Sequence, residues 1–364
     1  MTALFGNNPL ERVSGGLAVR AYSSAFSSHP RKFFLRPLPV GPAHGEHCLT
    51  NDVPSSVLPI FTTRKEIWRC WFLKATREYR RAKGIIVNTF ADLEPYAINS
   101  FLMEYSYGTS RLPSIFRIGP VLNTSQIQTQ STNDHSEMME WLDIQPEKSV
   151  VFPCFGSMGS LMLDQVKELA VGLEKCGYRF HWVLMQLPAK NGEFAGEFEN
   201  HGLALPEGIL DRTALIGKVV GWIPQMAILS HPAEGGFVSH YGWNSILEST
   251  RCGVPIAAWP VFGEQQFNAF QLVKELGMAV EISSDFSGAN EHQPLAKAEQ
   301  IEKGIREVMD GENDVRKEVK EFTEKCRQAM KEGYSSRVAF ENLMLTLCSS
   351  LHQASQVLGR FGKN

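Results

Sequence analysis

Short apolar runs and helical periods alternate along the second half of the chain. The apolar runs predict strands at residues 149–152, 180–185, 219–220, 235–238 and 255–259. Apolar residues at helical spacing predict helices at residues 164–176, 244–251, 264–276, 297–309, 314–332 and 337–350. Strands that alternate with helices in this way indicate a parallel sheet with helices on both faces.

The first half of the chain carries a weaker pattern. It predicts a helix at residues 64–82, a buried strand at 84–89 and a further helix that opens at 93–95. The polar stretch 123–137 indicates a linker or a long loop. We therefore divide the chain into an irregular leader (1–52), a partial first domain (53–122), a linker (123–137), a second domain (138–336) and a final helix (337–350).

Composition excludes several classes of protein. The chain is 43% hydrophobic and 21% charged with a net charge of −3, which is typical of a globular protein and gives no electrostatic footprint for nucleic acid. No apolar run is long enough for a transmembrane helix. The seven cysteines form no C-x-x-C pair, which favours a reducing compartment such as the cytoplasm. The basic, Ser-rich residues 1–40 resemble an organellar transit peptide, which stays the alternative location.

The block from residue 222 to residue 265 carries the strongest chemical signal. A Gly-Gly pair precedes the strand at 235–238, the turn Ser239–Gly242 follows, and a helix then begins. Such a helix start offers unpaired backbone N–H groups and the positive end of the helix dipole, which suits a pyrophosphate. His240 can add a charge or a donor, and the loop at 155–160 is a second candidate of the same kind. Neither loop matches the dinucleotide or P-loop glycine motif.

This block resembles the 44-residue signature of plant UDP-sugar-dependent glycosyltransferases, glycosyltransferase family 1. The matching residues are Trp222, Pro224, Gln225, His240, Gly242, Trp243, Asn244, Ser245, Glu248, Gly253, Val254, Pro255, Pro260, Glu264 and Gln265. The segments AKGIIVNTFADLEPYAI and WLDIQPEKSVVF, with FGSMGS, also resemble the family. The resemblance implies an α/β fold of the GT-B type, in which two Rossmann-like, doubly wound domains face a cleft. We expect the first of these domains to be truncated here and the last helix to cross back to it.

The resemblance also implies how the two ends of a UDP-sugar donor would be held. Trp222 would stack on the uracil, Gln225 would sit at the base edge, and Glu248 would accept both ribose hydroxyls. Glu264 and Gln265 would bind the sugar hydroxyls. A Gln at the last position of the block is associated with glucose in this family. UDP-glucose is therefore the expected co-substrate, with no cofactor, and a small phenolic or flavonoid molecule is the expected acceptor.

The remaining residues of the expected donor site lie around the phosphates. His240, Ser245 and Ser157 would hold the phosphate oxygens, and Trp243 and Asn244 would touch sugar or phosphate. Asn244 has an alternative role as the helix cap. No D-x-D triplet occurs in the chain, so we expect a metal-independent reaction in which helix dipoles and backbone donors stabilise the departing UDP.

The sequence departs from the family at three places. Tyr241 stands where the family usually has Cys, and its ring is expected to crowd the phosphate turn. Pro153 lies in the first strand of the second domain, and we expect it to shorten that strand because proline lacks a ladder donor. No counterpart of the family's catalytic His and its partner Asp is identified. The expected activity is inverting glucosyl transfer, and the alternative is an impaired UDP-sugar-binding remnant or a truncated gene product.

Overall fold

The computed structural model describes a defined set of residues. They are Pro54, Val57, Ala82 and the ranges 84–99, 113–124, 133–156, 161–187, 196–261, 264–283 and 295–361. The expected leader 1–52, almost all of the expected helix 64–82, and the loop residues 157–160 lie outside this set.

Six parallel strands form the main sheet in the order β10–β9–β8–β3–β4–β7. They span Val150–Cys154 (β3), Arg179–Val183 (β4), Gly217–Val220 (β7), Glu234–Ser239 (β8), Ile256–Ala258 (β9) and Ala279–Glu281 (β10). After β3, the chain forms β4 and β7 on one side of this strand and then β8, β9 and β10 on the other side. The strand order therefore reverses between β3 and β8, and doubly wound sheets bind their ligands beyond the carboxyl ends of the strands at such a reversal.

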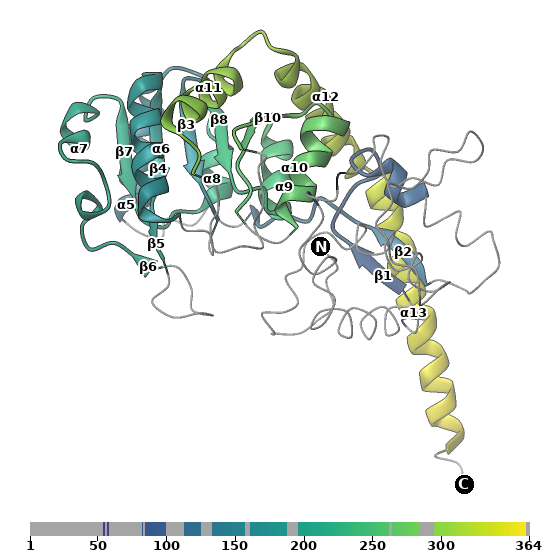
Figure 1. The fold of residues 1–364 in the computed structure, drawn as a ribbon. Coiled ribbons are helices and arrows are strands. Elements are labelled where there is room, and N and C mark those ends of the chain that lie inside the picture. The colour runs from purple at the N-terminus through teal and green to yellow at the C-terminus, as the bar shows by residue number, and fades with distance from the viewer. Residues whose placement is uncertain are drawn as a thin grey trace, which may run out of the picture.

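Helices cover both faces of this sheet (Figure 1). The helices are Asn133–Asp143 (α5), Leu163–Cys176 (α6), Ile209–Arg212 (α7), Gln225–Leu229 (α8), Trp243–Cys252 (α9), Gln265–Phe270 (α10), Ala298–Met309 (α11), Asp314–Ala329 (α12) and Ser335–Phe361 (α13). Successive side chains of β3 point to opposite faces. Val150 and Phe152 therefore join one core cluster, with residues of α9 and α12, whereas Val151 joins a second, with residues of α6 and α11.

Several elements differ from the expectations. The strand at 114–117 and the strand β10 were not predicted. Helix α5 begins at Asn133, inside the segment expected to be a linker, because Met138 and Leu142 are buried at helical spacing among polar neighbours. The helix expected at 264–276 changes at Gln271–Glu275 into a π-helical turn.

Pro153 does not shorten its strand. β3 continues to Cys154, and Pro153 pairs in register with Val238 of β8. On the other side, the paired residues of β3 and β4 are Val150, Val151 and Cys154 of β3, so the ladder passes over Pro153 there. The expectation was wrong because the lost donor affects only one of the two neighbouring strands.

A smaller sheet lies beside the main one. Strands β1 (Gly84–Val87) and β2 (Ser114–Arg117) pair in parallel. Phe90, which follows β1, is buried in the core cluster of the main sheet, and α13 lies against β2 (Figure 1). Helix α13 is longer than the expected 337–350. No helix within the described residues is long and apolar enough to cross a membrane.

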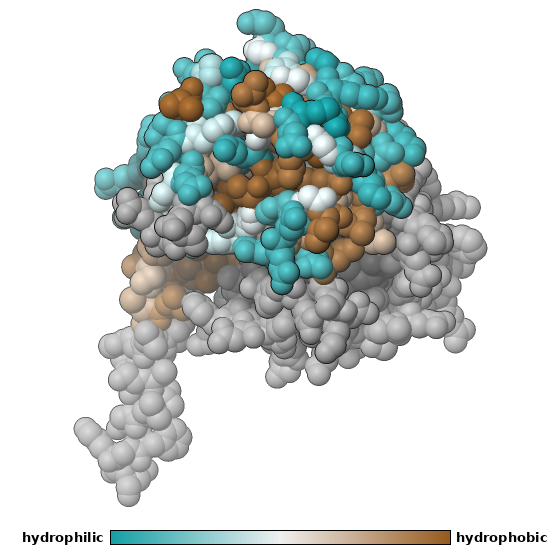
Figure 2. Space-filling view, turned by 90° about the vertical axis from the view of Figure 1, so that its left-hand side faces the viewer, coloured by the Kyte–Doolittle hydropathy of each residue, from teal (hydrophilic) through white to brown (hydrophobic). Residues whose placement is uncertain are grey.

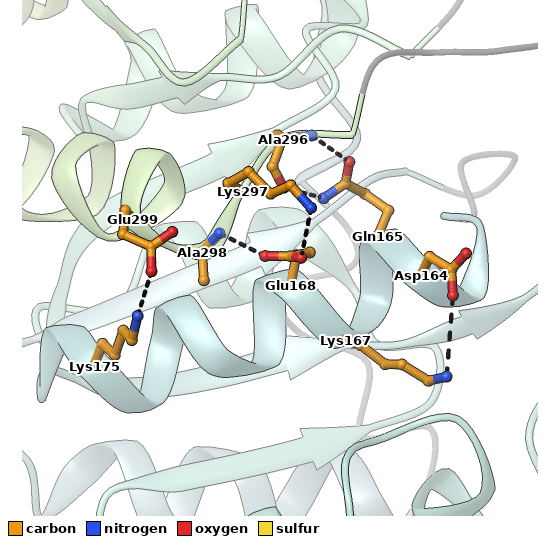
Figure 3. A network of polar contacts seen from close by, with 9 residues as sticks. All are labelled: Asp164, Gln165, Lys167, Glu168, Lys175, Ala296, Lys297, Ala298 and Glu299. Carbon is orange, nitrogen blue, oxygen red and sulfur yellow. Dashed lines mark hydrogen bonds and ion pairs between the residues drawn. The ribbon is translucent and has the colours of Figure 1, made fainter.

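A polar network joins α6 to the start of α11 (Figure 3). The Gln165 side chain donates to the carbonyl of Ala296 at 2.8 Å and accepts from its N–H at 2.9 Å. Glu168 accepts from the N–H of Ala298 at 2.7 Å, although no side chain of α11 itself caps this end. A carboxylate is favourable there because it satisfies an unpaired donor at the positive end of the helix dipole.

The β7 edge of the main sheet is bordered by apolar surface. Leu203 of the short helix His201–Leu203 and Leu215 before β7 are 80% and 94% exposed. Figure 2 shows apolar side chains framed by hydrophilic ones on this side of the molecule, which carries α7 and β7. A two-stranded ribbon of Met185–Gln186 (β5) and Gly196–Glu197 (β6) continues from β4, so that the predicted strand 180–185 is divided between two sheets.

Candidate functional site

The sheet brings the candidate residues to one edge. β3, β8 and β9 are neighbours in the sheet, and His240, Ser245 and Glu264 all follow the carboxyl ends of β8 and β9. Because the strands are parallel, these ends lie at the same edge of the sheet, at the reversal of strand order. The sequence block therefore becomes a spatial cluster. Ser157, a further candidate residue, lies outside the described residues.

Three candidate side chains are already joined by hydrogen bonds. The Gln225 amide, at the start of α8, donates to a Glu248 carboxylate oxygen at 2.7 Å and to the Ser245 hydroxyl at 3.1 Å. The Gln225 carbonyl accepts from the thiol of Cys154 at 3.7 Å. Burial raises the pKa of Glu248, and the hydrogen bond from Gln225 partly opposes this shift. We call Gln225, Ser245 and Glu248 the amide–carboxylate cluster.

Trp222 is the exposed member of the candidate set. It follows β7, and 44% of its surface is accessible to solvent. Its backbone N–H donates to the carboxylate of Glu197 on β6 at 3.0 Å, which ties the residue to the neighbouring ribbon. A fixed backbone with an exposed indole is a suitable platform for stacking on a flat ring.

The His240 ring lies between two glycines. A Cβ atom built on Gly156 would lie 2.6 Å from its Cε1, and one built on Gly242 would lie 2.5 Å from its Nε2. Both positions therefore need glycine for the ring to lie where it does. Nδ1 of His240 is buried and has no partner among the described residues. Burial lowers the pKa of His240 to about 4, so the imidazole is neutral at pH 7 and acts as a donor rather than as a charge.

Tyr241 does not crowd the turn. Its backbone adopts a left-handed conformation with φ of 67°, and its ring is fully buried in the core cluster of the main sheet. The hydroxyl has no hydrogen-bond partner among the described residues, and burial raises its pKa well above the ordinary value. The ring therefore supports the turn from the core side, which corrects the expectation of crowding.

The first two residues of α9 have different environments, because Trp243 is buried and Asn244 is exposed. The Trp243 indole is buried and donates to the carbonyl of Asn88, after β1, at 2.7 Å. The indole N–H is therefore already used, and only the backbone N–H of Trp243 is left to contact a ligand. Asn244 is exposed and does not cap the helix, because the N-cap residue is Gly242, whose backbone carbonyl accepts from Ile246. The alternative role of Asn244 as a cap is therefore wrong.

Glu264 and Gln265 lie at the start of α10. The Gln265 side chain is buried and accepts from the N–H of Val261 at 2.8 Å. Burial raises the pKa of Glu264 to about 7. Within the described residues, no group of three His, Cys, Asp or Glu side chains is placed to hold a metal ion.

Four residues around the site were missed by sequence reasoning. They are Asn88, Cys154, Glu197 and Asn268, which contact Trp243, Gln225, Trp222 and Tyr241 respectively. Asn268 had a detectable signal, because it lies one helical turn after Glu264. The other three are brought in by the folding of distant segments, and no local pattern marks them.

Comparisons with known proteins identify the family of the chain. Residues 112–312 match the model of the family described as UDP-glucoronosyl and UDP-glucosyl transferase. Anthocyanidin 3-O-glucosyltransferase 6 of Manihot esculenta is 46% identical, over 83% of this chain and 75% of that protein. The chain spans only 60–63% of the length of several other curated relatives.

Solved structures are similar as well. A transferase from Siraitia grosvenorii in complex with UDP superimposes with a TM-score of 0.80 at 41% identity, covering 92% of this chain and 75% of that one. A Medicago truncatula protein complexed with UDP-glucose gives 0.69 at 40% identity, covering 81% and 60%. The family match and the GT-B fold of these structures lead to the same assignment. It belongs to the UDP-glucoronosyl and UDP-glucosyl transferase family.

Proposed function

We propose that the chain binds UDP-glucose at the carboxyl edge of the main sheet and transfers its glucose to a small acceptor. The observation that carries this proposal is the position of the amide–carboxylate cluster beside the His240 turn, at the reversal of strand order. A nucleotide needs a ribose acceptor and a phosphate seat a short distance apart, and this edge offers both. The Medicago structure, complexed with UDP-glucose, supports the choice of donor.

The nucleoside end of the donor would lie against α8. Trp222 stacks on the uracil ring, Gln225 meets the base edge, and Glu248 accepts the two ribose hydroxyls. Since Gln225 holds one oxygen of this carboxylate, Glu248 is oriented before the nucleoside arrives. Such preorganisation lowers the entropy cost of binding.

The diphosphate would lie at the start of α9. Backbone N–H groups and the helix dipole attract the phosphate oxygens, and His240, Ser245 and Ser157 add side-chain donors. Asn244 and the backbone of Trp243 contact sugar or phosphate. Glu264 and Gln265, at the start of α10, accept hydrogen bonds from the glucose hydroxyls.

The proposed reaction is a metal-independent displacement with inversion. The acceptor oxygen attacks C1 of glucose, the bond from C1 to the phosphate oxygen breaks, and UDP leaves with the electron pair. Backbone donors at α9 stabilise the charge that develops on UDP. For a phenolic acceptor, the hydroxyl loses its proton to the solvent before the attack, and the phenolate oxygen is the nucleophile.

A phenolic or flavonoid hydroxyl is the proposed acceptor, because the name of the Manihot relative specifies an anthocyanidin 3-O-glucosyltransferase. We further propose that residues 53–122 contribute to acceptor binding, that residues 138–336 bind the donor, and that α13 joins the two parts. The cytoplasm is the proposed location, on the basis of cysteine usage.

The test combines donor binding with product detection. The full chain is incubated with UDP-glucose and a panel of flavonols and simple phenols, and UDP release and product mass are measured. A β-glucoside supports the whole proposal. UDP binding without any glucoside contradicts the transfer step and supports the donor-binding alternative, and the absence of UDP binding contradicts the donor site itself.

A further inference from the structure

The turn between β8 and α9 is held by a side chain from another helix. Asn268 of α10 is buried, and its amide Nδ2 donates to the backbone carbonyl of Tyr241 at 3.0 Å. The two residues are 27 positions apart in the chain. The contact therefore joins α10 to the turn that carries His240.

This turn needs external support. Tyr241 has a φ of 67°, a left-handed conformation that is unfavourable for a residue with a Cβ. Its own N–H reaches only the hydroxyl of Ser239, at 3.3 Å. The bond from Asn268 is thus the main polar contact that fixes the carbonyl side of this strained residue.

Because the peptide bond is planar, this hydrogen bond also orients the backbone at the proposed phosphate site. In a planar trans peptide, the carbonyl and the following N–H point in opposite directions. With the Tyr241 carbonyl turned toward α10, the N–H of Gly242 faces away from α10. Gly242 is the N-cap of α9, so its orientation also sets that of the first free N–H groups of the helix.

We propose that Asn268 is a positioning residue of the donor site, which orients the Tyr241–Gly242 peptide for the diphosphate and couples this seat to the helix that begins with Gln265. The inference rests on the proposed donor binding. It goes beyond it because Asn268 is not among the residues proposed to bind the nucleoside or the phosphates, and its side chain contacts the backbone of Tyr241 instead. The amide–carboxylate cluster lies on α8 and α9, and none of its contacts involves Asn268.

The test compares three ligands on the full chain. In Asn268→Leu, the side chain keeps its approximate size but loses the donor. We expect UDP and UDP-glucose to bind about tenfold more weakly, which corresponds to ~1.4 kcal/mol, and uridine to bind as in the parent. The shorter Asn268→Ser is the second variant, in case the leucine does not fold.

Thr323→Val is the matched control. Thr323 is also buried, and its hydroxyl lies within hydrogen-bond distance of two backbone carbonyls, that of Val319 in its own helix and that of Thr250 at the opposite end of α9. Its loss is expected to lower thermal stability without changing the ratio of UDP to uridine affinity. Equal weakening of uridine and UDP by Asn268→Leu, or no weakening of UDP, would overturn the proposal.

Hydrogen exchange without ligand separates this inference from the proposed function. Exchange of the amides at 240–245 is expected to accelerate severalfold in Asn268→Leu and to stay unchanged in Thr323→Val. If the parent chain binds neither UDP nor uridine, the proposed donor site fails, and the exchange rates still decide whether Asn268 orders the turn. Unchanged exchange in Asn268→Leu would refute its positioning role.

Discussion

The two ends of the proposed donor site differ in how their polar groups are satisfied. In the amide–carboxylate cluster, Gln225 donates to both Ser245 and Glu248 before any ligand is present. At the turn, a buried ring nitrogen of His240 has no partner among the described residues, and no side chain caps the start of α9. One end is thus preorganised by its own side chains, whereas the other depends on glycines and on the path of the backbone.

This difference predicts that substitutions at the two ends will change the affinities for uridine and UDP in different ways. Changes in the cluster should weaken uridine and UDP together, because both contain the nucleoside. Changes at the turn should weaken UDP alone.

The largest effect is expected at the preorganised end. Glu248→Gln keeps the shape of the side chain and one acceptor oxygen for Gln225, but it removes the charge that strengthens the bonds to ribose. Hydrogen bonds to charged groups contribute about 1.5–3 kcal/mol, so uridine and UDP should both bind roughly tenfold to a hundredfold more weakly. Isothermal calorimetry measures this directly. Glu341→Gln on the exposed face of α13 is the control, and unchanged uridine affinity would remove Glu248 from the site.

The second effect tests the backbone-dependent end. Gly242→Ala is compatible with the local backbone, whose φ is −62°, but the added Cβ would lie 2.5 Å from Nε2 of His240. The ring must move, at a cost of about 1–3 kcal/mol, and UDP should bind about tenfold more weakly while uridine is unaffected.

Two variants sharpen the interpretation of Gly242→Ala. Gly311→Ala adds a Cβ where nothing lies within 4 Å, so it should change neither affinity. In a His240→Ala background, Gly242→Ala should have little further effect, because the clashing ring is gone. Additive losses in the double variant would show that the glycine acts independently of His240.

The same contrast explains what the sequence could predict. The candidate residues between 222 and 265 lie in one contiguous block with fixed spacing, and the alternation of strands and helices around it predicted a parallel sheet correctly. The supports of the site come from elsewhere in the chain. Asn88 lies 155 residues before Trp243, and Cys154 lies 71 residues before Gln225, so only the fold brings them together.

Two errors had a physical origin of the same kind. The crowding expected from Tyr241 assumed that the ring points toward the turn, but the left-handed backbone directs it into the core. The shortening expected from Pro153 ignored the second neighbouring strand, β8, which continues to pair with it. Local rules identified the unusual residues, whereas their consequences depended on tertiary packing.

A smaller effect concerns the sugar and pH. Burial raises the pKa of Glu264 from about 4.5 to about 7, so its ionisation costs the folded protein stability as the pH rises through this range. Above pH 7, the ionised carboxylate accepts hydrogen bonds from glucose hydroxyls. The preference for UDP-glucose over UDP should therefore decline severalfold as the pH falls from 8 to 6. Competition binding across this range measures it. Glu264→Gln should flatten the profile, and a flat profile in the parent chain would contradict a sugar contact at Glu264.

The smallest effect tests whether Tyr241 belongs to the core or to the site. Its buried hydroxyl lacks a partner among the described residues, and such a group costs about 1–3 kcal/mol in desolvation. Tyr241→Phe keeps the ring in the core and removes that cost, so the free energy of unfolding should rise by about 1 kcal/mol. Urea unfolding should show a higher midpoint with an unchanged slope, and the affinities for UDP and uridine should stay the same. A weaker UDP affinity in Tyr241→Phe would mean that the hydroxyl serves the backbone-dependent end of the site, and the ring would then have to be counted with His240 rather than with the core.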